Sequence, residues 1–133
     1  MRFEVKIMKI VVLAGGLSPE RNVSLTSGAK VCQALRDCGH RTAIVDLYFG
    51  TQGRGVKTAS ELFDAPIPEE YRTVRPAPDL ARVEALRTGN LRGQFGPGVL
   101  ELCAMADVVF LALHGTCGED GRIQAAFDLL GIP

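Results

Sequence analysis

Two polar stretches, each directly after an apolar run, contain the side chains of this sequence that could do chemistry. Residues 15–21 read Gly-Gly-Leu-Ser-Pro-Glu-Arg, and residues 114–121 read His-Gly-Thr-Cys-Gly-Glu-Asp-Gly. The carboxylate of Glu20 and the imidazole of His114 are groups that can bind or orient a small charged ligand. Whether they can act together depends on the elements that carry them.

Three apolar runs, at residues 10–14, 41–48 and 107–113, are typical of β-strands. The first and third have almost no polar alternation, which favours strands covered on both faces of a parallel sheet. A helix of about 15 residues separates the first two strands, so this part of the chain is expected to form a parallel βαβ unit. The pattern predicts an α/β fold.

The helix after the first strand is expected to begin at Val23 or Ser24 and to end at Cys38, because apolar and small side chains recur there with helical spacing. Ser24 or Asn22 could cap its start, and Gly39 follows where a helix-terminating glycine is common. Gly28, on the apolar face, is expected to allow close packing of the helix on the sheet.

Further helices are predicted at residues 79–88, 97–105 and 121–130. The segment between residues 48 and 79 is rich in proline and glycine, so it is left unassigned as a functional loop, a flexible cover or a disordered stretch.

Glu20 and His114 are expected to lie near each other, because the carboxyl ends of parallel strands meet at one edge of the sheet. The helix dipole favours negative charge at Glu20, and a carboxylate there suits the binding of an ammonium group. Simpler interpretations remain open for each residue. Glu20 could only start a helix, His114 could only bind turn backbone, and Glu119 with Asp120 could be an acidic helix start.

Other classes of site fit less well. Gly15 and Gly16 allow a turn with backbone angles that other residues rarely adopt. The two glycines do not match the G-x-G-x-x-G dinucleotide fingerprint, although Asp46 stands where such folds carry a ribose-binding acid. No Walker A loop is present. Fifteen basic and fifteen acidic residues balance, which argues against a nucleic-acid binder. The sequence contains no apolar run of about 18 residues, so no membrane span is predicted. The four cysteines form no C-x-x-C pair and are expected to be free thiols in a reducing cytoplasm rather than a zinc site.

Taken together, the two stretches resemble the N-terminal domain of D-alanine–D-alanine ligases, members of the ATP-grasp superfamily. The resemblance rests on KIVVLAGGLSPERNVSLTSGAKV, which is similar to the family pattern GGxSxERxVSLxSG, and on VVFLALHGTCGEDGRIQAAFDLLGIP, which is similar to ALHGxxGEDGxxQ. It covers about residues 8–48 and 105–133. Asn22 and Cys117 depart from the residues the family often has at these positions.

The resemblance implies a Rossmann-like, three-layer pre-ATP-grasp domain whose mainly parallel sheet has about four strands. It implies a cytoplasmic enzyme that joins two D-alanines with ATP and Mg²⁺ through an acyl phosphate, for peptidoglycan synthesis. By the same resemblance, Glu20 is a catalytic residue that holds the amino group of the first D-alanine, and Val23 lines the methyl pocket. Ser24, His114 and Gly115 complete the substrate-binding residues it implies.

ATP-grasp enzymes also need a central and a C-terminal domain, which supply the ATP cleft and the magnesium carboxylates. Residues 1–133 are therefore expected to be the N-terminal substrate-binding domain only, inactive alone and without cofactor or metal sites. The full-length protein is expected to be a homodimer with no nucleic-acid or membrane partner. Two alternatives remain: a ligase that uses D-lactate or D-serine as second substrate, and a free-standing, non-catalytic Rossmann-like binding module.

Overall fold

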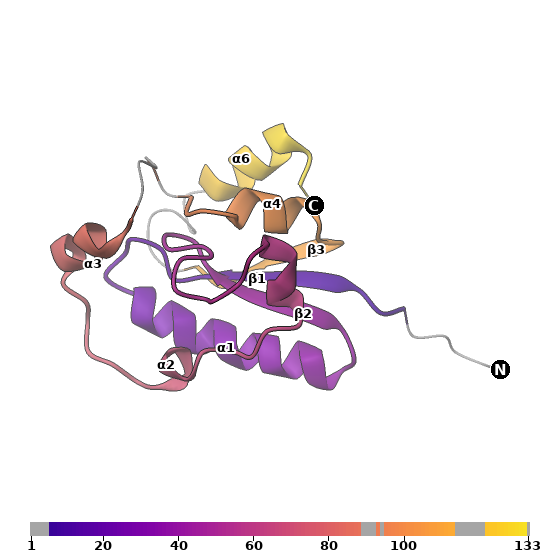
Figure 1. Cartoon of the computed structure of the whole chain (residues 1–133), viewed down its shortest axis with the longest axis horizontal. Helices are drawn as coiled ribbons and strands as arrows, with labels where there is room; N and C mark the ends of the chain where they lie inside the picture. Colours follow the sequence, from indigo (N-terminus) through magenta and orange to yellow (C-terminus); the bar gives the residue numbers. More distant parts are fainter. Residues whose placement is uncertain (1–5, 89–92, 94, 114–121, 133) are drawn as a thin grey trace.

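The structure is a computed structural model, and it describes residues 6–88, 93, 95–113 and 122–132. Three strands and six helical segments alternate along these residues (Figure 1). In chain order they are β1 (Lys9–Ala14), α1 (Arg21–Asp37), β2 (Arg41–Asp46), the 3₁₀ helix η1 (Ala59–Phe63), α2 (Glu69–Arg72), α3 (Leu80–Leu86), α4 (Val99–Ala104), β3 (Val108–Leu111) and α6 (Arg122–Leu130).

The sheet is parallel, with β1 in the centre and the strand order β2-β1-β3. The register pairs Ala14 with Asp46 and Leu13 with Leu111, so the three strands end at the same edge. The parallel α/β prediction is confirmed. The described residues hold three strands rather than about four, because only three of their segments carry an apolar run of strand length.

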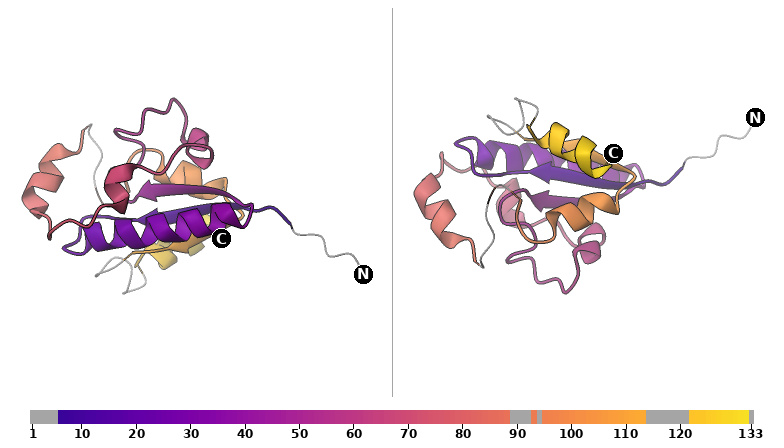
Figure 2. Two further views of the ribbon diagram at one scale, coloured as in Figure 1. Left: turned by 90° about the horizontal axis from the view of Figure 1, so that it is seen from below. Right: turned by 90° about the horizontal axis from the view of Figure 1, so that it is seen from above.

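Helices cover both faces of this sheet, as the three-layer prediction requires. Helices α1 and α2 lie on one face, and α4 and α6 lie on the other (Figure 2). Side chains of β1 alternate between the two resulting cores: Val11 and Leu13 pack on the side of α4 and α6, and Val12 and Ala14 pack on the side of α1. This two-sided burial explains why β1 is apolar without interruption.

Helix α1 begins at Arg21, earlier than predicted, and its N-cap residue is Glu20 rather than Ser24 or Asn22. The apolar periodicity starts only at Leu25, so it does not mark the first turn. Gly28 was expected to allow close packing of helix on sheet, and a Cβ at that position would lie 2.8 Å from the Cβ of Ala14. Gly39 follows the helix with φ +93°, as predicted for a terminating glycine.

The remaining elements refine the predicted boundaries. Strands β2 and β3 end two residues before the predicted ends, and α3, α4 and α6 lie within their predicted ranges. Gly98, with φ +76°, is the N-cap residue of α4, so Pro97 precedes the helix instead of occupying its first turn. The unassigned segment contains η1 and α2. Among the helices of the described residues, none combines the length and apolar character that a membrane span needs.

Candidate functional site

The candidate site is built on the glycine turn where β1 ends. Gly15 and Gly16 both have positive φ, +72° and +87°, a region that side chains rarely adopt. A Cβ on Gly15 would also meet Oδ1 of Asp46 at 2.7 Å. Backbone conformation and close approach therefore both require glycine at Gly15, as the sequence pattern suggested for this turn.

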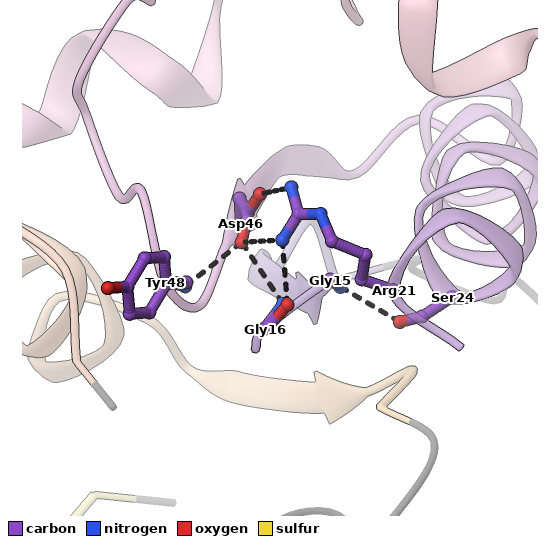
Figure 3. A network of polar contacts seen from close by, with 6 residues as sticks. All are labelled: Gly15, Gly16, Arg21, Ser24, Asp46 and Tyr48. Carbon is purple, nitrogen blue, oxygen red and sulfur yellow. Dashed lines mark hydrogen bonds and ion pairs between the residues drawn. The ribbon is translucent and has the colours of Figure 1, made fainter. Parts of the chain in front are cut away.

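A buried ion pair lies against this turn, between Arg21 at the start of α1 and Asp46 at the end of β2 (Figure 3). Arg21 is 6% exposed and Asp46 is 1% exposed. Nη2 of Arg21 donates to Oδ2 of Asp46, and Oδ1 of Asp46 accepts hydrogen bonds from the backbone N–H groups of Gly16 (3.1 Å) and Tyr48 (2.9 Å). The carboxylate is fully engaged inside the protein.

The same guanidinium also binds the turn itself. Nη1 of Arg21 donates to the carbonyl oxygen of Gly16 at 2.7 Å, and it lies 3.4 Å from Oδ1 of Asp46. The ring of Phe49 lies beside it, with 5.2 Å between the guanidinium carbon and the ring centroid. Several partners around each charge offset the cost of removing the two charges from water.

Ser24 connects the turn to the third strand. Its hydroxyl accepts a hydrogen bond from the Gly15 N–H (2.8 Å) and donates one to the carbonyl oxygen of Ala112 (2.6 Å). Ala112 in turn donates its N–H to Leu13 at 2.9 Å. The chain leaving β3 is thus held beside the chain leaving β1, and the predicted meeting of these two strand ends is confirmed as far as the described residues extend.

The structure places three of the five predicted site residues at the start of α1. Glu20 is exposed, and its carboxylate makes no hydrogen bond or ion pair with another described residue. Val23 is also exposed, at 58%. Ser24 is completely buried, so contact with a substrate would require its two backbone hydrogen bonds to be exchanged. His114 and Gly115 lie outside the described residues, as do Glu119 and Asp120, and their roles stay predictions.

Sequence reasoning missed the pairing of Arg21 with Asp46. From the sequence, Asp46 is recognisable only as an acid at a strand end, in the position where dinucleotide-binding folds contact a ribose. In the structure both oxygens of that carboxylate bind protein groups. A basic residue at a helix start is unfavourable to the helix dipole, which was a signal that Arg21 has a nearby anion.

A cleft of about 470 Å³ adjoins the pair on the side of α2 and α3. Arg21, Asp46 and Tyr71 line it, whereas Glu20 and Val23 do not. Burial, and then the charge of Asp46, raises the pKa of the Tyr71 hydroxyl to about 12. This phenol therefore stays neutral at physiological pH. The pair forms a wall between the cleft and the glycine turn.

The cysteines of the described residues are free thiols, as predicted. Burial raises the pKa of Cys103 to about 12, and burial also raises the pKa of Cys32 despite nearby arginines. Cys38 is exposed, and Cys117 lies outside the described residues. Within the part of the chain that the structure describes, no cluster of three or more His, Cys, Asp or Glu side chains could hold a metal ion.

Comparison with known proteins adds to this geometry. Residues 9–133 match the family model described as D-ala D-ala ligase N-terminus. A protein of Lacticaseibacillus casei named D-alanine–D-alanine ligase is 43% identical over 126 residues, which are 94% of this chain and 35% of that protein. A Pediococcus pentosaceus protein of the same name is 42% identical, over 92% of this chain and 35% of the relative. A Leptospira interrogans protein, again of that name, is 33% identical, over 94% of this chain and 32% of its own length. The chain thus spans about a third of the length of the relatives it matches.

Proposed function

This chain belongs to the D-ala D-ala ligase N-terminus family, and on that ground we propose that it is the domain of a D-alanine–D-alanine ligase that binds the first D-alanine. The full-length protein would join two D-alanines with ATP. The two matched relatives named above at 42% and 43% identity support this assignment, since both carry the name of that ligase.

The state of Glu20 is the observation that carries the proposal. Arg21, Asp46 and Ser24 surround the glycine turn, but their polar groups are engaged with one another or with backbone. Glu20 precedes the first residue of α1 and is exposed, and its carboxylate has no hydrogen-bonding or ionic partner among the described residues. Among the described residues around this turn, Glu20 is therefore the charged group that can accept hydrogen bonds from a ligand. An alanine ammonium group is a donor of matching charge.

The remaining parts of the assignment follow from the same family. Val23, in the first turn of α1 and exposed, would contact the alanine methyl group. Ser24 would act from beneath the turn, and His114 with Gly115 would approach from the loop after β3. ATP and Mg²⁺ would bind domains outside these residues, so the 133 residues alone would release no phosphate. A cytoplasmic homodimer is the expected form of the full-length enzyme.

The test is replacement of Glu20 in the full-length gene product, with D-alanine-dependent phosphate release as the assay. Glutamine keeps an acceptor oxygen but removes the charge that faces the ammonium group, and hydrogen bonds between charged groups are about twice as strong as neutral ones. Glu20→Gln should therefore lower kcat/KM for the first D-alanine by about 10-fold. Glu101→Gln is the matched control, because Glu101 is likewise an exposed acid close to the start of a helix, on α4 at the opposite face of the sheet. Unchanged kinetics in Glu20→Gln would show that the assignment of Glu20 is wrong.

A further inference from the structure

We infer that Arg21 and Asp46 are positioning residues for the first substrate: the buried pair locks the glycine turn and the start of α1, and thereby sets where Glu20 presents its carboxylate. This inference rests on the proposed function, because it assigns the pair an effect on the binding of the first D-alanine. Neither residue is a predicted site residue, and neither touches the substrate in this scheme.

The first step is the orientation of the Gly16 backbone. Its N–H donates to Oδ1 of Asp46 at 3.1 Å, and its carbonyl oxygen accepts from Nη1 of Arg21 at 2.7 Å. Both polar backbone groups of one glycine are thus held by the two members of one ion pair (Figure 3). A glycine is otherwise free to change its backbone angles, so this turn depends on side chains to hold it.

The second step concerns the short segment, residues 17–20, that carries Glu20. Only four residues, 17–20, connect Gly16 to Arg21, and the Arg21 side chain bonds directly back to Gly16. Ser18 holds this segment at two points. Its carbonyl oxygen accepts a hydrogen bond from the Arg21 N–H at 3.0 Å, and its hydroxyl oxygen accepts one from the Glu20 N–H at 3.1 Å. Gly16 and Arg21, the residues on either side of this segment, are bonded to each other. The ion pair therefore sets the backbone position of Glu20.

The third step is that both members of the pair are held by partners inside the protein, although they also line the cleft beside α2 and α3. Both oxygens of Asp46 already accept hydrogen bonds inside the protein, from Arg21 and from the N–H groups of Gly16 and Tyr48, and the residue is only 1% exposed. The Arg21 guanidinium is buried against the Phe49 ring. The pair also joins the ends of β1, β2 and α1, which are the elements whose relative placement fixes this edge of the site. Preorganised geometry of this kind is what substrate binding requires.

The test uses Asp46→Asn in the full-length gene product. Asparagine has nearly the same shape and keeps an oxygen for the Gly16 and Tyr48 N–H groups, but it removes the charge that holds Arg21. We expect KM for the first D-alanine to rise about 10-fold while kcat at saturation changes less than about 3-fold, which corresponds to about 1.4 kcal/mol of binding. Asp64→Asn is the matched control, since Asp64 pairs with Arg41 at 2.9 Å on the exposed surface.

A double-mutant cycle separates positioning from general stability. If the pair acts through Glu20, then Asp46→Asn should add less than about 2-fold to KM once Glu20→Gln is present. If Asp46→Asn yields too little folded protein, Arg21→Lys replaces it in the same cycle, because lysine keeps the charge and loses the forked contact with Asp46 and Gly16. Additive effects, or an unchanged KM in the variant, would overturn the inference. If Glu20→Gln alone left KM unchanged, the proposed function would fail instead, so the two failures are distinct.

Discussion

Replacing Gly28 with alanine should destabilise the protein, although alanine is the better helix former. Gly28 lies in the middle of α1 and faces the sheet. An added Cβ would lie 2.8 Å from the Cβ of Ala14, 3.3 Å from Cδ1 of Ile44 and 3.4 Å from Cγ1 of Val12. Carbon atoms pack best at about 3.5–4.0 Å. Ile44 and Val12 have rotamers to change, but the Cβ of Ala14 moves only with the backbone of the central strand.

The expected magnitude follows from two opposed effects. Helix propensity favours alanine over glycine by about 1 kcal/mol. Overpacking a filled core costs about 1–3 kcal/mol, and the upper half of that range applies because α1 must move roughly 1 Å away from β1 to relieve the contact with Ala14. Such a gap would loosen the packing of Leu25 and Cys32, which are buried residues of α1. The net loss in the free energy of unfolding is therefore about 1–2 kcal/mol.

Urea unfolding of the 133-residue chain, with m-values compared between variants, measures this loss. Ser27→Ala is the control on the same helix, because Ser27 is only half-buried and its replacement should change stability by less than about 0.5 kcal/mol. The decisive variant is Ala14→Gly combined with Gly28→Ala, which removes one of the two clashing carbons. The double variant should be more stable than the sum of its single changes by at least about 1 kcal/mol. A Gly28→Ala protein as stable as the parent, or strictly additive effects, would refute the packing argument.

Two further predictions concern titration and reactivity. Because the pKa of Tyr71 is raised to about 12 in the folded state from an ordinary value of 10.0, the stability that its burial contributes is complete below pH 10 and is lost as pH rises toward 12. Urea unfolding measured between pH 10 and 12 should show a smaller fall in the free energy of unfolding for Tyr71→Phe than for the parent. An equally steep fall in the variant would contradict the prediction. In native protein, Cys38 should react with a maleimide much faster than Cys32 or Cys103, since it is exposed and they are buried with raised pKa values. Peptide mapping by mass spectrometry locates the label, and equal labelling of the buried thiols before unfolding would contradict the prediction.

The scaffold of the site could be predicted because it depends on long, regular patterns. The apolar run of β1 and the helical spacing from Leu25 onward are local signals, and parallel strands place their ends at one edge by rule. Gly15 and Gly28 were also recognisable, since a turn and a close helix–sheet contact both favour glycine. These features are sufficient to predict that Glu20 lies at the edge of the sheet where the strands end.

The position of Arg21 at a helix start indicates a nearby anion, but the sequence does not indicate that this anion is Asp46, which lies 25 residues away in the chain. They meet only through the register that places Ala14 opposite Asp46, and register depends on tertiary packing rather than on local sequence. The early start of α1 has the same origin, since a buried anion outweighs the unfavourable dipole at Arg21. Helix α2 was missed for a related reason: it has four residues, and its buried Tyr71 packs on the core beneath α1.

A structure of the full-length gene product with D-alanine bound would test the proposed role of this domain most directly. We predict that the ammonium nitrogen of one D-alanine lies within about 2.7–3.2 Å of a Glu20 carboxylate oxygen. In the same structure, the Arg21–Asp46 pair should still bind both polar backbone groups of Gly16. An ammonium group bound away from the start of α1, with Glu20 facing solvent, would contradict the assignment of this edge as the first-substrate site.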